Sequence, residues 1–201
     1  ASHSERTLMQ RMNTAALPNT HANTLSECEA LDRHDDLRSL RELFQLPEGV
    51  IYLDGNSLGV LPKATPARVA NAVAKEWGQD LIKSWNTADW FQMPQQVGNK
   101  IARLIGAQSG EVIAADSTSI NLFKVLSAAL SIAQTDHPEK KIILSEQTNF
   151  PTDLYIAEAL CKERGFTLKL LAAEEILASL SQDIAVLMLT HVNYRTGAMH
   201  N

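Results

Sequence analysis

The chain has 201 residues, of which 45% are hydrophobic and 20% are charged, a composition that supports a packed core and argues against global disorder. Its net charge is −5 and it has no block of basic residues, which argues against nucleic acid as the main partner. It contains no run of about 18 apolar residues, so we expect no transmembrane helix.

The two ends of the chain and its cysteines indicate location and completeness. The N-terminus, ASHSERTLMQRMNT, lacks the apolar segment of a secretory signal. Cys28 and Cys161 lie far apart, so the sequence indicates no disulfide framework and fits a reducing cytoplasm. The predicted strand Ile184–Thr190 is followed only by HVNYRTGAMHN, where a crossover helix would be expected. We therefore expect the chain to be the N-terminal piece of a longer protein.

The first part of the chain combines a polar arm, residues 1–22, with a helical pattern of leucines over Asn23–Leu46. We interpret the sequence HDD at 34–36 as a solvated turn, because no second ligand cluster with a known metal spacing is present, and we expect no metal site. Val50–Leu53 is predicted to be a short strand. The glycines of GNSLG at 55–59 indicate a plain turn, a turn with unusual backbone angles, or a close approach to a ligand.

A long helical region is predicted from Pro62 to about Trp85, where a Trp-rich connection, SWNTADWFQMP, begins. Clustered aromatic side chains in such a connection can form a pocket wall, a subunit interface or the edge of a core. Another helix is predicted over Val97–Ile105, and Gly106 should end it.

The stretch from Val112 to Ala133 has the order strand, hydroxyl residues, helix. Val112–Ala115 is predicted to be a buried strand, and a helical pattern runs from Ile120 to Ala133. Between them, Asp116–Ser119 can cap the helix, because a side-chain oxygen accepts a hydrogen bond from its free N–H groups. The same N–H groups and hydroxyls can bind an anion. On these residues alone, an ordinary cap is the favoured interpretation.

The second half of the chain alternates strands with helices, and this predicts an α/β fold with a mainly parallel sheet flanked by helices. The predicted strands are Lys141–Ser145, Thr167–Leu171 and Ile184–Thr190, and the predicted helices are Pro151–Arg164 and Glu174–Leu180. Ligands of such sheets bind at the carboxyl ends of the strands. We therefore expect three polar junctions to converge on one site: Asp116–Ser119, Asn149–Asp153 and Thr190–Thr196.

Several common site motifs are absent from the sequence. It contains no GxGxxG after a strand, no GxxxxGK[ST] and no GxSxG, which argues against dinucleotide, P-loop and α/β-hydrolase sites. His191 and His200 have no evident nucleophile partner, and we interpret them as structural.

Four motifs, taken together and in this order, resemble kynureninase, a pyridoxal-phosphate enzyme of the aspartate-aminotransferase fold. They are YLDGNSLG at 52–59, DSTSINLF at 116–123, NFPTD at 149–153 and VNYRTG at 192–197. The resemblance runs from about Val50 to Asn201 and implies fold type I, incomplete in this chain. Residues 1–48 would then be an N-terminal arm and helical segment, and residues 49–201 the first part of the large cofactor-binding domain.

The resemblance implies a role for five residues toward pyridoxal 5'-phosphate. Thr118 and Ser119 match the pair that holds the phosphate, which agrees with the preference of a dianion for hydroxyls at a helix start. Phe150 matches the aromatic residue that stacks on the pyridine ring. Asp153 matches a carboxylate that contacts the cofactor, and a carboxylate near a pyridinium keeps it protonated. Thr190 matches a hydroxyl residue near the ring.

The implied activity is hydrolytic Cβ–Cγ cleavage of L-kynurenine, or 3-hydroxykynurenine, to anthranilate, or 3-hydroxyanthranilate, and L-alanine in tryptophan catabolism. A cytoplasmic homodimer acting on a small molecule is implied as well. The family's Schiff-base lysine has no counterpart here, since Lys124 does not match it, so we expect the catalytic lysine beyond Asn201. Two alternatives stay open: another pyridoxal-phosphate enzyme of the cysteine desulfurase or aminotransferase class, or an inactive cofactor-binding or scaffolding fragment.

Overall fold

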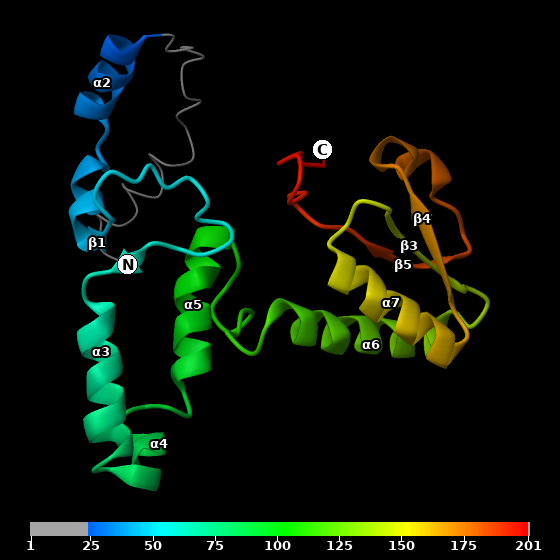
Figure 1. Cartoon of the computed structure of the whole chain (residues 1–201). Helices are drawn as coiled ribbons and strands as arrows, with labels where there is room; N and C mark the ends of the chain where they lie inside the picture. The colour runs from blue at the N-terminus through cyan, green and yellow to red at the C-terminus, as the bar shows by residue number, and fades with distance from the viewer. Residues whose placement is uncertain (1–23, 201) are drawn as a thin grey trace. The chain divides into compact units, whose positions relative to one another are not determined.

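The computed structural model describes residues 24–200 as two compact units, the first ending at Asp89 and the second beginning at Trp90 (Figure 1). The predicted arm, residues 1–22, lies outside the described residues. The domain boundary expected between residues 48 and 49 concerns the longer protein and stays a prediction. Each unit holds together through its own contacts, and the candidate site lies in the second.

The first unit consists of short elements. They are helix α2 (Leu25–His34), a 3-10 helix (Arg38–Leu43), strands β1 (Phe44–Gln45) and β2 (Leu61–Pro62), helix α3 (Thr65–Asn71), a π-helix (Ala72–Trp77), a 3-10 helix (Leu81–Lys83) and helix α4 (Ser84–Thr87). Helix α2 begins with a capping box, because the Thr24 hydroxyl accepts from Glu27 N–H at 3.3 Å and the Glu27 carboxylate accepts from Thr24 N–H at 3.0 Å. The helical pattern predicted over Asn23–Leu46 is thus confirmed in two pieces, α2 and the 3-10 helix Arg38–Leu43, with a turn between them. Its first residue lies outside the described residues, and at its end β1 pairs antiparallel with β2.

One prediction for the first unit is wrong, and another is confirmed only in part. Val50–Leu53 forms no strand, because nothing in the described chain pairs with it, and Ile51 is 88% exposed. The helical region predicted from Pro62 to Trp85 is confirmed over residues 65–77 and 81–87, but it is interrupted between these two stretches. At Leu81 the backbone φ is 51°, and a right-handed helix cannot continue through a left-handed residue.

The motif YLDGNSLG forms a loop that is closed by hydrogen bonds of its own. The Tyr52 hydroxyl donates to the carbonyls of Asp54 and Leu58, at 2.9 and 2.7 Å, and the Ser57 hydroxyl donates to the Asp54 carboxylate at 2.9 Å. Neither glycine of GNSLG has a positive φ or a described atom close to the place of a Cβ. The two glycines therefore do not supply unusual backbone angles, and the alternatives of a plain turn and a close approach to a ligand stay predictions.

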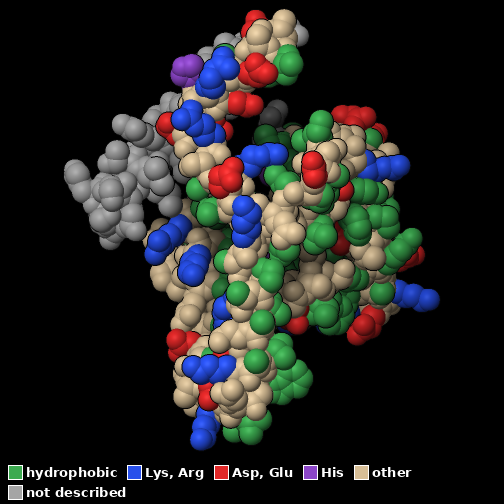
Figure 2. All heavy atoms as spheres, turned by 60° about the vertical axis from the view of Figure 1, so that its left-hand side comes forward, with side chains coloured by type: hydrophobic (Ala, Val, Ile, Leu, Met, Phe, Trp, Pro, Cys, Tyr) green, Lys and Arg blue, Asp and Glu red, His purple; other side chains and the backbone are tan. Residues whose placement is uncertain are grey.

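Apolar side chains remain at the surface of the first unit, and Figure 2 shows hydrophobic side chains gathered at its lower end, where α4 lies in Figure 1. Among the large exposed ones are Val69, Val73, Trp77, Leu81, Ile82 and Trp85. Phe91 of the Trp-rich connection is exposed too. These aromatic side chains therefore do not fill the edge of a core within residues 24–200.

The second unit is an α/β layer around a three-stranded parallel sheet in the order β4-β3-β5. Its elements are α5 (Met93–Ile105), α6 (Thr118–Asp136), β3 (Ile142–Glu146), α7 (Pro151–Arg164), β4 (Thr167–Leu171), two 3-10 turns (Ala173–Glu175 and Leu177–Ser179) and β5 (Ile184–Met188). The α/β fold with a parallel sheet and flanking helices is therefore confirmed. The helix expected over Glu174–Leu180 is replaced by the two 3-10 turns.

The core lies between the sheet and the helix pair α6 and α7, which pack against each other (Figure 1). In the register, Ile143 of β3 stands beside Leu168 of β4 and Val186 of β5, and this row faces the helices. The buried members of this core are Leu126, Leu130, Ala133, Ile143, Ala157, Leu160, Cys161, Phe166 and Met188. Each large aliphatic side chain buried there stabilises the fold by about 1.5–3 kcal/mol.

The helix ends follow local signals in the sequence. Gly106 and Gly165 end α5 and α7 in the left-handed conformation, with φ of 76° and 73°, as their positions after the last apolar residues predicted. Pro151 occupies the first turn of α7, where its missing N–H is not needed. Val112–Ala115, in contrast, is not the predicted buried strand, because it packs along α5 and pairs with no strand of the described chain.

Candidate functional site

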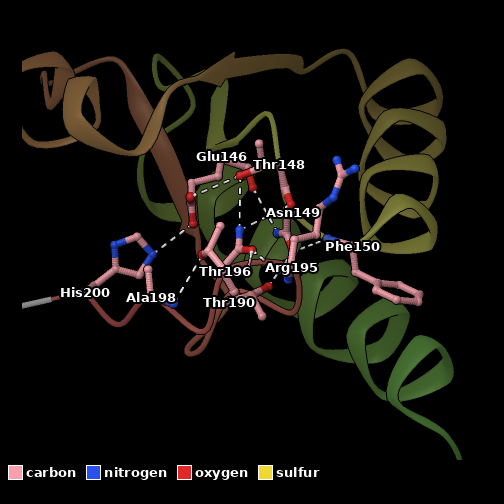
Figure 3. A network of polar contacts seen from close by, with 11 residues as sticks. Glu146, Thr148, Asn149, Phe150, Thr190, Arg195, Thr196, Ala198 and His200 are labelled. Carbon is pink, nitrogen blue, oxygen red and sulfur yellow. Dashed lines mark hydrogen bonds and ion pairs between the residues drawn. The ribbon is translucent and has the colours of Figure 1, made fainter. Parts of the chain in front are cut away.

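The ends of strands β3 and β5 are tied together by side chains from two of the three polar junctions (Figure 3). The Thr190 hydroxyl, which follows β5, donates to Oδ1 of Asn149, which follows β3. The Asn193 amide donates to the hydroxyl of Thr148 at 3.1 Å. The junctions Asn149–Asp153 and Thr190–Thr196 therefore converge at the carboxyl edge of the sheet.

The third polar junction, Asp116–Ser119, precedes α6. It lies at the same carboxyl edge of the sheet, because α6 and α7 run in the same direction. Each helix leads into the amino end of a parallel strand, α6 into β3 and α7 into β4. Near its end, α7 is fixed to α6 where the Arg164 guanidinium donates to the Ser131 hydroxyl at 3.0 Å. Pro151 precedes Arg164 by 13 positions, and Thr118 precedes Ser131 by 13 positions. At about 1.5 Å per residue, both helices therefore begin on the same side of the sheet, and α6 starts up to about one turn further out, because the Gln134 amide also donates to the carbonyl of Arg164 at 3.2 Å.

The start of α6 separates the capping residue from the two hydroxyl residues predicted to bind phosphate. Ser117 is the N-cap, and its hydroxyl accepts from Ile120 N–H at 3.4 Å. Thr118 and Ser119 are the first two helical residues, and within residues 24–200 their hydroxyls and N–H groups make no hydrogen bond. Four donors and a helix N-terminus are thus available to an anion at this position.

The loop before α6 is held in place by side chains on both of its sides. The Asn121 amide donates to the carbonyl of Ala115 at 2.7 Å, and Lys124 forms an ion pair with Asp116, whose φ is 45°. Aspartate tolerates this left-handed conformation better than most residues. Lys124 therefore has a visible structural role in shaping the start of α6.

Helix α5 also supports this loop, because the backbone of α5 at Gly98 approaches the loop backbone at Val112 very closely. A Cβ on Gly98 would lie 2.0 Å from the carbonyl oxygen of Val112, so only glycine fits there. That carbonyl accepts from the Gln95 amide at 2.9 Å, and Ala114 N–H donates to the carbonyl of Pro94 at 3.1 Å.

Phe150 stands at the N-cap of α7 with its ring 46% exposed, so it is no core residue of the described chain. Its N–H donates to Oδ1 of Asn149 at 2.7 Å, and the Asn149 amide donates to the hydroxyl of buried Ser145 at 3.2 Å. Its ring meets that of Tyr194 edge to face, with centroids 5.0 Å apart and planes at 70°. In Figure 3 the Phe150 side chain points away from the polar network.

Asp153 lies in the first turn of α7, and its N–H donates to the carbonyl of Phe150 at 3.0 Å. Partial burial raises the pKa of the Asp153 carboxyl above its usual value, because a charged carboxylate is less well solvated there. Its side chain forms no ion pair within residues 24–200. A cationic group bound near Asp153 would therefore find a carboxylate without a competing partner.

The sequence assigned no individual role to three polar residues that shape this edge, although two of them, Asn149 and Asn193, belong to the predicted junctions. Asn149 and Asn193 are buried amides that bridge the two junctions, and Glu146, 3% exposed at the end of β3, pairs with His200 at 3.0 Å. Their position within a few residues of the ends of predicted strands was the available signal. The partners could not be read from the sequence, since they lie in the other junction.

Two further observations concern metal ions and membranes. Across residues 24–200, no three His, Cys, Asp or Glu side chains gather in a way that could hold a metal ion. None of the helices in that range is long and apolar enough to cross a bilayer.

Comparison with curated proteins gives matches to kynureninases over most of the chain. The chain is 55% identical to the kynureninase of Pseudomonas fluorescens over 181 residues, which cover 89% of the chain and 44% of that protein. Over the same length it is 51% identical to the kynureninase of Burkholderia pseudomallei (strain 1106a) and 50% identical to that of Burkholderia mallei (strain SAVP1). No family model matches. The resemblance to kynureninases is confirmed, and the chain spans less than half the length of these relatives.

Proposed function

We propose that the protein to which these residues belong is a kynureninase, a hydrolase that cleaves the Cβ–Cγ bond of L-kynurenine or 3-hydroxykynurenine and releases L-alanine. The observation that carries the proposal is the 55% identity to a kynureninase over 181 residues. The relatives favour neither the cysteine desulfurase or aminotransferase class nor a scaffolding role. A cytoplasmic homodimer of aspartate-aminotransferase fold type I is part of the same proposal.

The residues at the carboxyl edge fit pyridoxal 5'-phosphate as the cofactor. Thr118 and Ser119 would hold its phosphate, supported by their unused hydroxyls and by the N–H groups at the start of α6. The half-exposed ring of Phe150 would stack on the pyridine ring. The Asp153 carboxylate would receive the protonated ring nitrogen, which suits a partly buried acid without a cationic partner.

Bound pyridoxal phosphate supplies an electron sink for negative charge at the substrate's α-carbon. The contribution of this chain is to bind and orient. Asp153 would keep a proton on the ring nitrogen of the bound cofactor, because a carboxylate stabilises a nearby cation. Phe150 would cover one face of the ring and exclude water from it, while the donors at residues 118 and 119 would hold the phosphate end.

Near the pyridine ring of the cofactor, the Thr190 hydroxyl would be able to accept a hydrogen bond but not to donate one. Its proton is engaged by Oδ1 of Asn149, so toward the cofactor the hydroxyl oxygen can only accept. The same bond fixes Asn149 and, through it, the backbone of Phe150. Thr190 therefore also orients the stacking residue.

The test uses the purified full-length protein with L-kynurenine, 3-hydroxykynurenine and L-cysteine, each with and without added pyridoxal phosphate. We expect cofactor-dependent release of alanine together with anthranilate or 3-hydroxyanthranilate. Cofactor-dependent sulfide release from cysteine without either anthranilate would point to the desulfurase class. The absence of any product with bound cofactor would support the inactive alternative.

A further inference from the structure

Two aromatic residues stand side by side at the carboxyl edge, one on each of the converging junctions. Phe150 follows β3 and Tyr194 follows β5, and their rings lie 5.0 Å apart at 70°. Both are about half exposed, at 46% and 54%. Because the two rings are exposed at the edge of the sheet where ligands of such folds bind, apolar ring surface is available there to a ligand.

Each of these rings follows directly after a buried asparagine that fixes its backbone. Asn149 accepts from Phe150 N–H at 2.7 Å. Asn193 accepts from the N–H groups of Arg195 and Thr196, at 3.0 and 3.3 Å, and so forms the turn that carries Tyr194. The two asparagines position both Cα atoms, which leaves only the side-chain torsions to be set.

The ring contact supplies the restraint that the backbone does not. A half-exposed phenylalanine with a fixed backbone still has its side-chain torsions free, and ordering them on binding lowers affinity. The edge-to-face contact with Tyr194 restricts the Phe150 ring before any ligand arrives. Tyr194 reaches this position from the neighbouring strand, and sequence reasoning gave it no role.

We propose that Tyr194 is a positioning residue that holds the ring of Phe150 ready to stack on a flat heteroaromatic cofactor. The inference rests on the proposed function, since it takes pyridoxal phosphate as the ligand stacked on Phe150. It assigns Tyr194 an effect through Phe150 and no direct contact with the cofactor.

The experiment measures the Kd of pyridoxal phosphate for the full-length apo-protein and four variants: Tyr194→Phe, Tyr194→Leu, Phe150→Leu and the double variant Phe150→Leu/Tyr194→Leu. Tyr194→Phe keeps the ring contact and should bind as the parent does. Tyr194→Leu should weaken binding about two- to tenfold, the range expected for the loss of an aromatic pair. In the Phe150→Leu background the same change should have little further effect, because the residue acts through Phe150.

Apo melting temperatures show whether each variant is folded, and Tyr194→Gln replaces Tyr194→Leu if the latter does not fold. An unchanged Kd in the non-aromatic variant overturns the inference. So does an equal loss with and without Phe150, which would indicate direct contact or a general structural role. If the parent protein itself binds no pyridoxal phosphate, the proposed function fails and not the aromatic coupling alone.

Discussion

The hydroxyl of Thr190 donates a hydrogen bond to the side-chain oxygen of Asn149, 41 positions earlier in the chain, and this bond joins the ends of β5 and β3. The same oxygen accepts from Phe150 N–H, and the amide nitrogen donates to Ser145. Asn149 is 4% exposed, so its polar atoms depend on these partners in place of water. One buried side chain thus connects two strand ends with the residue that would stack on the cofactor.

Asn149→Ala should lower the free energy of unfolding by about 1–3 kcal/mol, since it leaves buried partners of the amide unsatisfied. It should also weaken binding of pyridoxal phosphate, because Phe150 loses its anchor. Urea unfolding and cofactor titration of the full-length protein measure the two effects. Gln147→Ala, an exposed neighbour, is the matched control and should change neither. An Asn149→Ala protein with the stability of its parent contradicts this account of the strand ends.

Gly98→Ala should destabilise the second unit by about 1–3 kcal/mol, because the new methyl group would meet the Val112 carbonyl at 2.0 Å. Alanine normally favours a helix over glycine by about 1 kcal/mol, so the expected sign is the reverse of the helix preference. Lys100→Ala, at an exposed position of the same helix, should change stability little. Thermal unfolding compares the three proteins, and a Gly98→Ala protein more stable than its parent would show that the loop does not pack there.

Asp153→Asn should change how the stability of the apo-protein depends on pH. Partial burial raises the pKa of Asp153 in the folded state, so the folded protein binds this proton more tightly than the unfolded chain does. The stability from this group is complete below the unfolded pKa of about 4 and is lost as pH rises through the folded pKa. The asparagine variant has no such loss.

Melting temperatures of both apo-proteins between about pH 4 and pH 7 test this sign. As pH rises, the melting temperature of the variant should increase relative to that of its parent. The variant should nevertheless bind pyridoxal phosphate less tightly, because asparagine cannot form an ion pair with a protonated ring nitrogen. A parent that gains stability relative to the variant toward neutral pH would falsify the assignment of a raised pKa.

The two cysteines should differ sharply in reactivity. Cys161 is buried in the core of the second unit, and burial, with a smaller contribution from the charge of Glu158, raises the pKa of its thiol. Cys28 is exposed on α2. Brief alkylation of the native protein followed by peptide mapping should label Cys28 and leave Cys161 unmodified until denaturant is added. Equal labelling of both thiols in the native protein is the contrary result.

Some helices and strands could be predicted because residues at their own ends, such as a proline or a glycine, mark where they begin and stop. Helix Pro151–Arg164 and strand Thr167–Leu171 have the predicted bounds, since Pro151 marks the start of the helix and Gly165 its end. The apolar runs at 50–53 and 112–115 have the pattern of strands but form none in the structure. Periodicity cannot distinguish a strand from an apolar segment that packs against a helix, because only a pairing partner defines a strand.

The candidate site was predictable in its location but not in its internal connections. Parallel strands bring their carboxyl ends to one edge, which is why the polar junctions at 149–153 and 190–196 could be expected to meet. The bonds that join them depend on partners 41 and 45 positions apart, Asn149 with Thr190 and Thr148 with Asn193. No local pattern specifies such pairs. The assignment of capping to Ser117, with Thr118 and Ser119 left unused, likewise needed the helix start itself.

The central claim is that Thr118 and Ser119 bind the phosphate of the cofactor. Its most direct test is titration of the full-length apo-protein and its Thr118→Ala/Ser119→Ala variant with pyridoxal phosphate and with pyridoxal, which has no phosphate. Because Ser117 remains as the cap, we expect the variant to keep the apo stability of its parent, without the loss of about 0.5–2 kcal/mol that is typical of a removed cap. It should bind pyridoxal phosphate more weakly and bind pyridoxal as before. Equal loss of affinity for both ligands, or no loss for either, would contradict the claim.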